Sequence, residues 1–144
     1  MTQVPHDNDY IAMFDKRLIH GTPTVEQIGK PLSYFCQRNI FLDCRGTLQI
    51  HPTSEWGWNV MVITQSHDIS SGQWVVTTCD RPVMVEEYAW ICSRALLYNC
   101  HIQHHAVVAA GAVVRNMTVE PYTVVEGNPA LAVKRYVDGQ WIPI

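Results

Sequence analysis

The chain has 144 residues, of which 47% are hydrophobic and 16% are charged, so it is expected to fold as one ordered domain. Its net charge is −3 and it contains no basic run, which argues against nucleic acid as a partner. The polar start of the chain predicts no secretory signal, and no apolar stretch reaches about 18 residues, so membrane insertion is not expected. Five cysteines without a C-x-x-C pair predict reduced thiols in a cytoplasmic protein.

Residues 1–39 show little periodicity and are interpreted as a lead-in segment. Within it, residues 10–18 fit one short amphipathic helix. Residues 25–39 are expected to form a short helix or irregular chain, because Gly29 and Pro31 argue against a long element. The main domain is expected over residues 40–135, followed by a tail over residues 136–144.

A six-residue repeat is the main structural signal from Ile40 onward. Large apolar residues recur at this interval and continue after a slip of one residue, at Ile50, Trp56, Val62, Val85, Ile91, Leu97, Ile102, Val108 and Val114. The fifth position of the later repeats is mostly small, at Ala89, Ala95, Ala106, Ala112 and Thr118. A period of six fits neither an α-helix nor simple strand alternation. It predicts a parallel β-helix with three short strands per turn, with the small residue at the corner.

Two interruptions of the repeat are informative. Over residues 65–82 the pattern is lost in a polar stretch, which predicts a loop extruded from the scaffold, where function is often located. The step from Leu97 to Ile102 is five residues instead of six, for which the sequence offers no reason. After the repeat, residues 130–144 predict a final strand or short helix that covers the open end of the coil.

Four segments, in this order, carry a resemblance to a known family: Leu42–Gly46, Thr64–Asp68, Pro82–Ile91 and Ala109–Ala130. Across roughly residues 40–135 the chain resembles the hexapeptide-repeat acyltransferases, in particular the sugar and polysaccharide O-acetyltransferases related to maltose and galactoside acetyltransferases. The resemblance implies an all-β fold built on a left-handed parallel β-helix and a homotrimer. It also implies transfer of an acetyl group from acetyl-CoA to a hydroxyl of a sugar or glycan precursor, without a metal.

His67 opens the extruded loop directly after an apolar strand, where the resemblance places the catalytic histidine. A hydroxyl that attacks a thioester needs a base for its proton, and imidazoles titrate near neutral pH. We therefore expect His67 to be the general base and not merely a polar loop residue. Asp68 is expected either to orient the imidazole or to satisfy the loop backbone. Asp43 and Arg45 are expected either to contact the acceptor, as the resemblance implies, or to form a solvated corner.

Contacts to acetyl-CoA are likewise implied by the resemblance. Trp90 and Ser93 lie in the segment that matches the surroundings of the thioester, although Trp90 fits simple packing between coils equally well. Ala110 and Gly111 match the stretch along which the pantetheine arm lies. Small residues there let the arm approach backbone N–H and C=O groups.

The chain departs from the family where the coenzyme phosphates are held. Arg115-Asn116 stands where the family typically has Thr-Lys, and Leu131 stands where a basic residue often follows the Gly-Asn-Pro-Ala motif. Arg115 and Lys134 are therefore expected to supply the positive charge. Cys92, where many members have glycine, is expected to be a small packed residue and not a nucleophile.

Two alternative functions are open from the sequence. His67 together with His101, His104 or His105 resembles the zinc-binding histidines of the trimeric γ-class carbonic anhydrases. The altered coenzyme-facing residues also fit a non-catalytic β-helix trimer.

Overall fold

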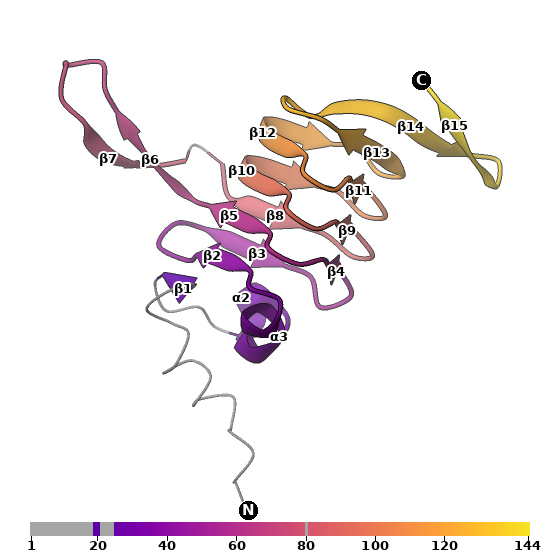
Figure 1. Ribbon diagram of the computed structural model, residues 1–144, viewed down its shortest axis with the longest axis horizontal. Coiled ribbons are helices and arrows are strands. Elements are labelled where there is room, and N and C mark those ends of the chain that lie inside the picture. Colours follow the sequence, from indigo (N-terminus) through magenta and orange to yellow (C-terminus); the bar gives the residue numbers. More distant parts are fainter. Residues whose placement is uncertain (1–18, 21–24, 80) are drawn as a thin grey trace, which may run out of the picture.

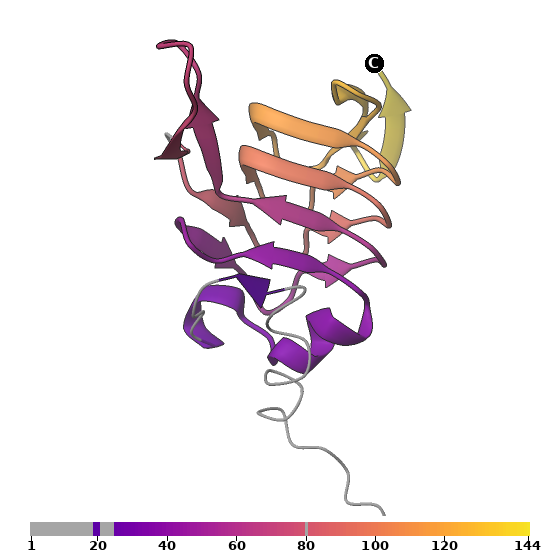
Figure 2. The same ribbon diagram turned by 60° about the vertical axis from the view of Figure 1, so that its left-hand side comes forward.

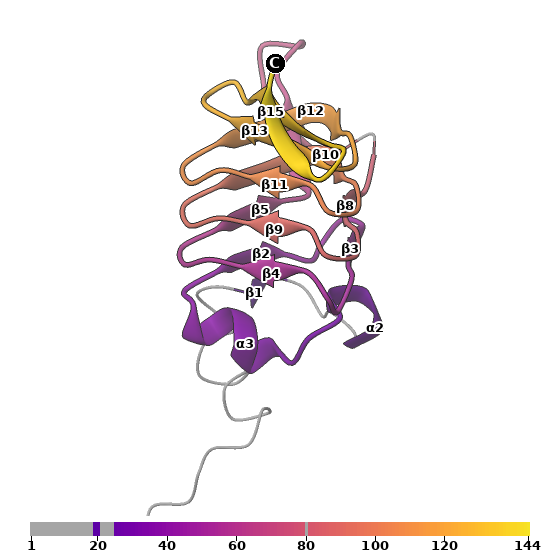
Figure 3. The ribbon, with the colours of Figure 1, turned by 90° about the vertical axis from the view of Figure 1, so that its right-hand side faces the viewer.

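The computed structural model describes residues 19–20, 25–79 and 81–144. The helix expected over residues 10–18 lies outside this part of the chain. Two short helices follow, α2 (Val25–Ile28) and α3 (Leu32–Gln37). Phe35 on α3 is fully buried and packs edge-on against Trp56 of the first coil, with 5.7 Å between ring centroids. The helices thus cover the lower end of the coil with apolar side chains (Figure 3).

The body of the molecule is a curled parallel sheet, formed by three ladders of strands that stack coil upon coil (Figures 1 and 3). The first ladder joins β1 (Ile19–His20), β2 (Phe41–Asp43), β5 (Met61–Ile63) and the first halves of β10 (Leu96–Ile102) and β12 (Val113–Val119). The second joins β3 (Leu48–Ile50), β8 (Val83–Val85) and the second halves of β10 and β12. The third joins β4 (Glu55–Trp56), β9 (Trp90–Ile91), β11 (Val107–Val108) and β13 (Thr123–Glu126).

Three corners connect these ladders and recur from coil to coil. The first corner lies between the first and second ladders, the second corner between the second and third, and the third corner between the third ladder and the first ladder of the next coil. Paired strand residues in neighbouring coils are 17 residues apart, as for Trp90, Val107 and Val124. One coil is therefore one residue shorter than three steps of six.

The missing residue is removed at the first corner, where β10 and β12 bend without interruption. Asn99 and Asn116 occupy the bends with left-handed backbone angles, φ 48° and 54°. Their side chains stack, because Asn99 Nδ2 donates to Asn116 Oδ1 at 2.7 Å. Asparagine tolerates the left-handed region better than most residues. The five-residue step seen in the sequence is therefore a regular corner, and it occurs in two successive coils.

The large apolar positions of the repeat form the core, as expected. The predicted inward-facing side chains are buried: Ile50, Trp56, Val62, Val85, Ile91, Leu97, Ile102, Val108 and Val114. The small corner residues Ala89, Ala95, Ala106 and Ala112 are buried as well. Thr118 differs, since it lies in β12 with an exposed side chain. The preceding short corner shifts the register, so Thr118 pairs with His101 in the second ladder and does not fill a corner.

Two hairpins extend the coil in opposite directions (Figures 1 and 2). The segment predicted to leave the scaffold forms a projecting antiparallel pair, β6 (Gln65–Asp68) and β7 (Val75–Thr78). At the other end, β14 (Leu131–Val137) and β15 (Gln140–Pro143) continue the third ladder in antiparallel fashion from β13. This confirms the expected final strand; β14 runs past residue 135, where the sequence suggested that the tail begins. No helix within the described ranges has the length and apolarity that a membrane span requires.

Candidate functional site

The first corner holds the root of the β6–β7 hairpin through a buried network around Asp43. Its Oδ2 accepts the backbone N–H of Thr64 at 3.1 Å, immediately before the hairpin begins. Its Oδ1 accepts Arg45 Nε at 2.7 Å, and Oδ2 also accepts Arg45 Nη2 at 3.1 Å. The Thr64 hydroxyl donates to the Asp43 carbonyl oxygen and accepts the N–H of Gly46. Thr64 was not recognised from the sequence, although it is the residue through which this corner positions the hairpin.

Asp43 is fully buried and both of its carboxylate oxygens are used within the chain. Burial raises its pKa, but hydrogen bonds from the Arg45 side chain and from the N–H groups of Thr64 and Arg45 outweigh this effect, so the pKa lies below the usual aspartate value. The Arg45 side chain is 48% exposed. Of these two sequence-derived acceptor candidates, Arg45 thus presents a group to solvent while Asp43 anchors the corner.

His67 lies on β6 of the projecting hairpin, paired with Val76 on β7. Its exposed imidazole meets the edge of the Trp74 ring, with 5.1 Å between centroids and an interplanar angle of 84°. Asp68 turns to the loop instead, where its Oδ1 accepts the N–H of Ser70 at 2.8 Å. This bond lowers the pKa of Asp68. The imidazole is therefore held by an aromatic edge, and Asp68 satisfies the loop backbone.

Ser93 lies at the third corner and is packed closely against the coil below. Its Oγ accepts the backbone N–H of Trp58 at 2.9 Å. Gly57 lies so near that an added Cβ would stand 2.5 Å from Ser93 N and 2.6 Å from Ser93 Oγ. Trp90, three residues before Ser93, is on the outer face of the third ladder and is 53% exposed. The hydroxyl of Ser93 is thus committed to the neighbouring coil, while the indole of Trp90 is accessible.

We expect Gly57→Ala to lower the free energy of unfolding by about 1–3 kcal/mol, because the methyl group forces two coils apart. Urea unfolding followed by circular dichroism measures this change. Adding Ser93→Ala to Gly57→Ala removes the clash with Oγ but not the clash with the backbone nitrogen, so only part of the lost stability should return. Unchanged stability in the single variant would contradict the close contact.

Ala110 and Gly111 form an open strip at the same corner. Gly111 has φ +72°, and a Cβ built on it would meet no atom within 4 Å. Its N–H donates to the Ser93 carbonyl oxygen, whereas the N–H of Ala110 has no partner within the described residues. An extended ligand can therefore approach the backbone here without a side chain in its way, as a pantetheine arm requires.

The two basic candidates lie apart from this strip. Arg115 is exposed on β12, next to the bend at Asn116, and so lies near the first corner. Lys134 is exposed on β14 and pairs with Val124. Neither makes an ion pair with any residue that the structure describes.

The candidate site residues thus divide between two corners of one chain. His67, Asp68, Asp43 and Arg45 belong to the first corner, whereas Ser93, Ala110 and Gly111 belong to the third. With 17 residues per coil, each side is roughly 15–20 Å long. Groups at the two corners of one chain are too far apart to act on the same atoms, since a reacting hydrogen bond spans about 3 Å.

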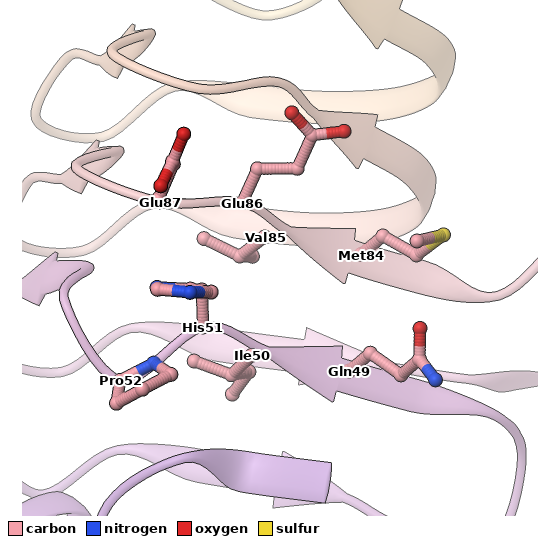
Figure 4. Close-up of a pocket in the computed structure, with 8 residues that line it drawn as sticks. All are labelled: Gln49, Ile50, His51, Pro52, Met84, Val85, Glu86 and Glu87. Atoms are coloured by element: carbon pink, nitrogen blue, oxygen red, sulfur yellow. The ribbon is translucent and has the colours of Figure 1, made fainter.

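The second corner carries the remaining histidines and a hollow of about 410 Å³ between two neighbouring coils (Figure 4). In this view Glu86 and Glu87 lie on the upper coil and His51 on the lower. Glu86 is already engaged, because Oε1 lies 2.5 Å from His101 Nε2 and Oε2 accepts the N–H of His104. Across the described ranges, no group of three or more histidine, cysteine or carboxylate side chains could hold a metal ion.

Cys92 is half-buried, and burial raises the pKa of its thiol. Cys100 is fully buried on β10, and the same effect raises its pKa to about 12. Thiols of this kind are weak nucleophiles at neutral pH, because the thiolate is the reactive form. Neither cysteine is suited to carry an acyl group.

Comparison with known proteins adds two solved structures. No family model matches the chain, and no curated protein matches it. The chain is similar to a maltose O-acetyltransferase from Clostridium difficile 630, with a TM-score of 0.57 and 25% identity over 69% of this chain and 53% of that one. It is also similar to a hexapeptide-repeat-containing acetyltransferase from Vibrio cholerae O1 biovar eltor complexed with acetyl coenzyme A, with a TM-score of 0.53 and 25% identity over 64% and 52%. The chain therefore spans about half the length of each. These likenesses confirm the predicted resemblance to the hexapeptide-repeat acetyltransferases.

Proposed function

From this resemblance to the hexapeptide-repeat acetyltransferases, we propose that the chain transfers an acetyl group from acetyl-CoA to a hydroxyl of a sugar or glycan precursor. The observation that carries the proposal is the open strip at Ala110 and Gly111, which gives a ligand access to the backbone. It occurs in a fold for which one solved neighbour is complexed with acetyl coenzyme A. We include a left-handed coil and a cytoplasmic location in the proposal.

His67 is the proposed general base. Its imidazole accepts the proton of the acceptor hydroxyl as the hydroxyl oxygen bonds to the thioester carbonyl carbon. It returns that proton to the sulfur as the carbon–sulfur bond breaks, so no proton is gained or lost overall. The Trp74 edge limits rotation of the ring. Arg45 and Asp68 are proposed acceptor contacts, with Asp43 holding Arg45 in place.

The coenzyme contacts are proposed at the third corner and on the faces beside it. Ala110 and Gly111 take the pantetheine arm, and Trp90 walls the acetyl end with Ser93 beneath it. Arg115 and Lys134 are exposed cations without an intramolecular ion pair in the described part of the chain, so both are available to phosphates. Their separation from Gly111 is compatible with a coenzyme that lies extended over more than one element.

A ring of three chains is proposed because one chain separates the base from the coenzyme strip. Contact between the first corner of one copy and the third corner of the next joins unlike surfaces, and repetition of such a contact closes into a ring. The projecting hairpin is the element that reaches towards a neighbour (Figure 2). Each complete site then contains His67 from one copy and Gly111 from another.

A thiol-release assay with acetyl-CoA and a panel of free sugars, nucleotide sugars and oligosaccharides tests the transfer. We expect thiol release that depends on an acceptor and yields an acetyl ester detectable by mass spectrometry. Absence of release with every acceptor, while the chain is folded, would favour the non-catalytic alternative.

Mixing two inactive variants tests whether the site is shared between copies. His67→Ala removes the base, and Ala110→Trp blocks the strip. If the variants are co-expressed in equal amounts, about one quarter of shared sites contain an intact first corner and an intact third corner. We expect activity to return to about that fraction of the wild-type rate. No recovery in purified mixed assemblies would place both corners of a working site in one copy and contradict the ring.

A further inference from the structure

An aromatic groove runs along the outer face of the third ladder, away from the His67 hairpin. Its floor is formed by Trp90 and Val107, and the C-terminal hairpin contributes Tyr136 and Trp141 as one wall. The second corner contributes the other wall, Tyr88, His105 and Tyr122. This part of the groove encloses about 500 Å³, within the range of small-molecule sites.

The groove continues beyond Trp90. A second hollow of about 490 Å³ shares Tyr88 and Trp90 with the first and is also lined by Thr53 and Glu55. The two hollows together make an elongated surface that follows the third ladder from the C-terminal hairpin towards the first coil. A ligand that fills this surface is longer than one ring.

The second corner carries aromatic residues at a backbone conformation that disfavours them. Tyr88, His105 and Tyr122 are 17 residues apart and have φ values of 54°, 58° and 53°. At the first corner the equivalent left-handed positions are asparagines, Asn99 and Asn116. Bulky side chains are uncommon in this region, and such residues concentrate at functional sites. The chain therefore places aromatic rings at this corner at a conformational cost that asparagine would reduce.

Stacking between coils accounts for only part of this arrangement. His105 and Tyr122 stack at 4.6 Å with nearly parallel planes. Tyr136 and Trp141 come from a different element, yet they extend the same row, with ring centroids 5.9 Å and 5.3 Å apart along Tyr122, Tyr136 and Trp141. The N–H of Tyr136 donates to the Tyr122 carbonyl oxygen, which holds the C-terminal hairpin against the corner.

The polar groups of the groove are neutral and available. Within the described residues, the phenol hydroxyls of Tyr122 and Tyr136 and the indole N–H of Trp90 and Trp141 have no hydrogen-bond partner. No lysine or arginine lines either hollow. Aromatic faces bind the C–H faces of sugar rings, and unpartnered O–H and N–H groups bind sugar hydroxyls. Phosphate-bearing ligands, by contrast, require cations.

We propose that this aromatic groove binds a neutral oligosaccharide of several sugar units. The inference rests on the proposed function for its link to the acceptor, which the groove would hold as a glycan chain. Binding itself requires neither acetyl-CoA nor His67.

Calorimetry and saturation-transfer NMR without acetyl-CoA test the groove. The probes are glucose, maltotetraose, cellotetraose and tetra-N-acetylchitotetraose, with choline chloride as a cationic probe. We expect at least one tetrasaccharide to bind more tightly than glucose. Trp141→Ala and Tyr136→Ala should each weaken that binding by about tenfold. Trp58→Ala is the matched control, because Trp58 is an exposed tryptophan outside the groove and its loss should leave the affinity unchanged.

Tyr136→Phe separates stacking from hydrogen bonding, since it keeps the ring and removes the hydroxyl; it should retain most of the affinity lost in Tyr136→Ala. Four results would overturn the proposal: no binding of any sugar, equal binding by Trp141→Ala, preference for choline, or a smaller assembly in the Trp141→Ala and Tyr136→Ala variants that shows the groove is covered by a second copy. Transfer to free sugars tests the proposed function separately. Sugar binding without transfer, or transfer without binding at the groove, distinguishes the two failures.

Discussion

Replacement of His67 by alanine is expected to lower the turnover number of acetyl transfer by about a hundredfold or more, the contribution of a general base. The fold should be unaffected, because the imidazole is exposed on the β6–β7 hairpin and its one ring contact is the edge of Trp74. The thiol-release assay measures the rate, and circular dichroism with size-exclusion chromatography verifies the fold and assembly.

The matched control is His51→Ala, because His51 is an exposed histidine at the second corner, remote from the hairpin. Its Nδ1 lies 2.8 Å from the Thr53 hydroxyl, so a small loss of stability is acceptable while the rate should stay near that of the wild type. A near-normal rate in a folded His67→Ala variant would remove the base assignment. An equal loss in both variants would show a general structural effect.

Asp43→Ala is expected to destabilise the chain by about 2–4 kcal/mol at neutral pH, because it leaves the N–H groups of Thr64 and Arg45 without their acceptor. The root of the His67 hairpin should open at the same time. Urea unfolding measures the stability, and amide hydrogen exchange over residues 64–79 measures the hairpin. Asp43→Asn keeps the shape and one acceptor oxygen, so it should lose less.

The pH dependence of this effect has a defined sign. The pKa of Asp43 is lower in the folded chain than in the unfolded chain, so the unfolded carboxyl binds its proton first as the pH falls. The stabilisation is complete above the unfolded aspartate pKa of about 4 and is lost as the pH falls through the folded value. The stability difference between wild type and Asp43→Asn should therefore be constant from pH 7 to pH 5 and shrink below about pH 4. A difference that grows on acidification would contradict the network.

The coil was predictable because its signal is local and repeated. Each strand contributes one inward side chain, so positions such as Ile91, Leu97 and Val108 reveal the period, and all are buried. Thr118 was misplaced because a period of six was assumed where the true coil has 17 residues. The spacing of Tyr88, His105 and Tyr122 contained the correct number, but single aromatic residues among polar neighbours carry no hydrophobic periodicity.

The candidate site was predictable only as a set of residues. The resemblance named His67 and Gly111, which lie on an exposed hairpin and an open strip as such roles require. It also named Asp43, whose carboxylate turns out to be buried in the chain's own hydrogen bonds. Which oxygen meets which N–H group depends on how two coils meet, and the order of residues along one coil does not contain this information.

The amino-acid sequence by itself determined the winding of the chain, its apolar interior and the place where the hairpin leaves it. These features follow from burying one side chain per short strand, which is a property of each segment and its immediate neighbours. The tertiary structure alone decided that the proposed base and the coenzyme strip lie on different corners, that Asp43 fastens the hairpin, and that the C-terminal hairpin completes an aromatic groove. These features depend on contacts between residues 17 or more positions apart, whose geometry is set by coil stacking.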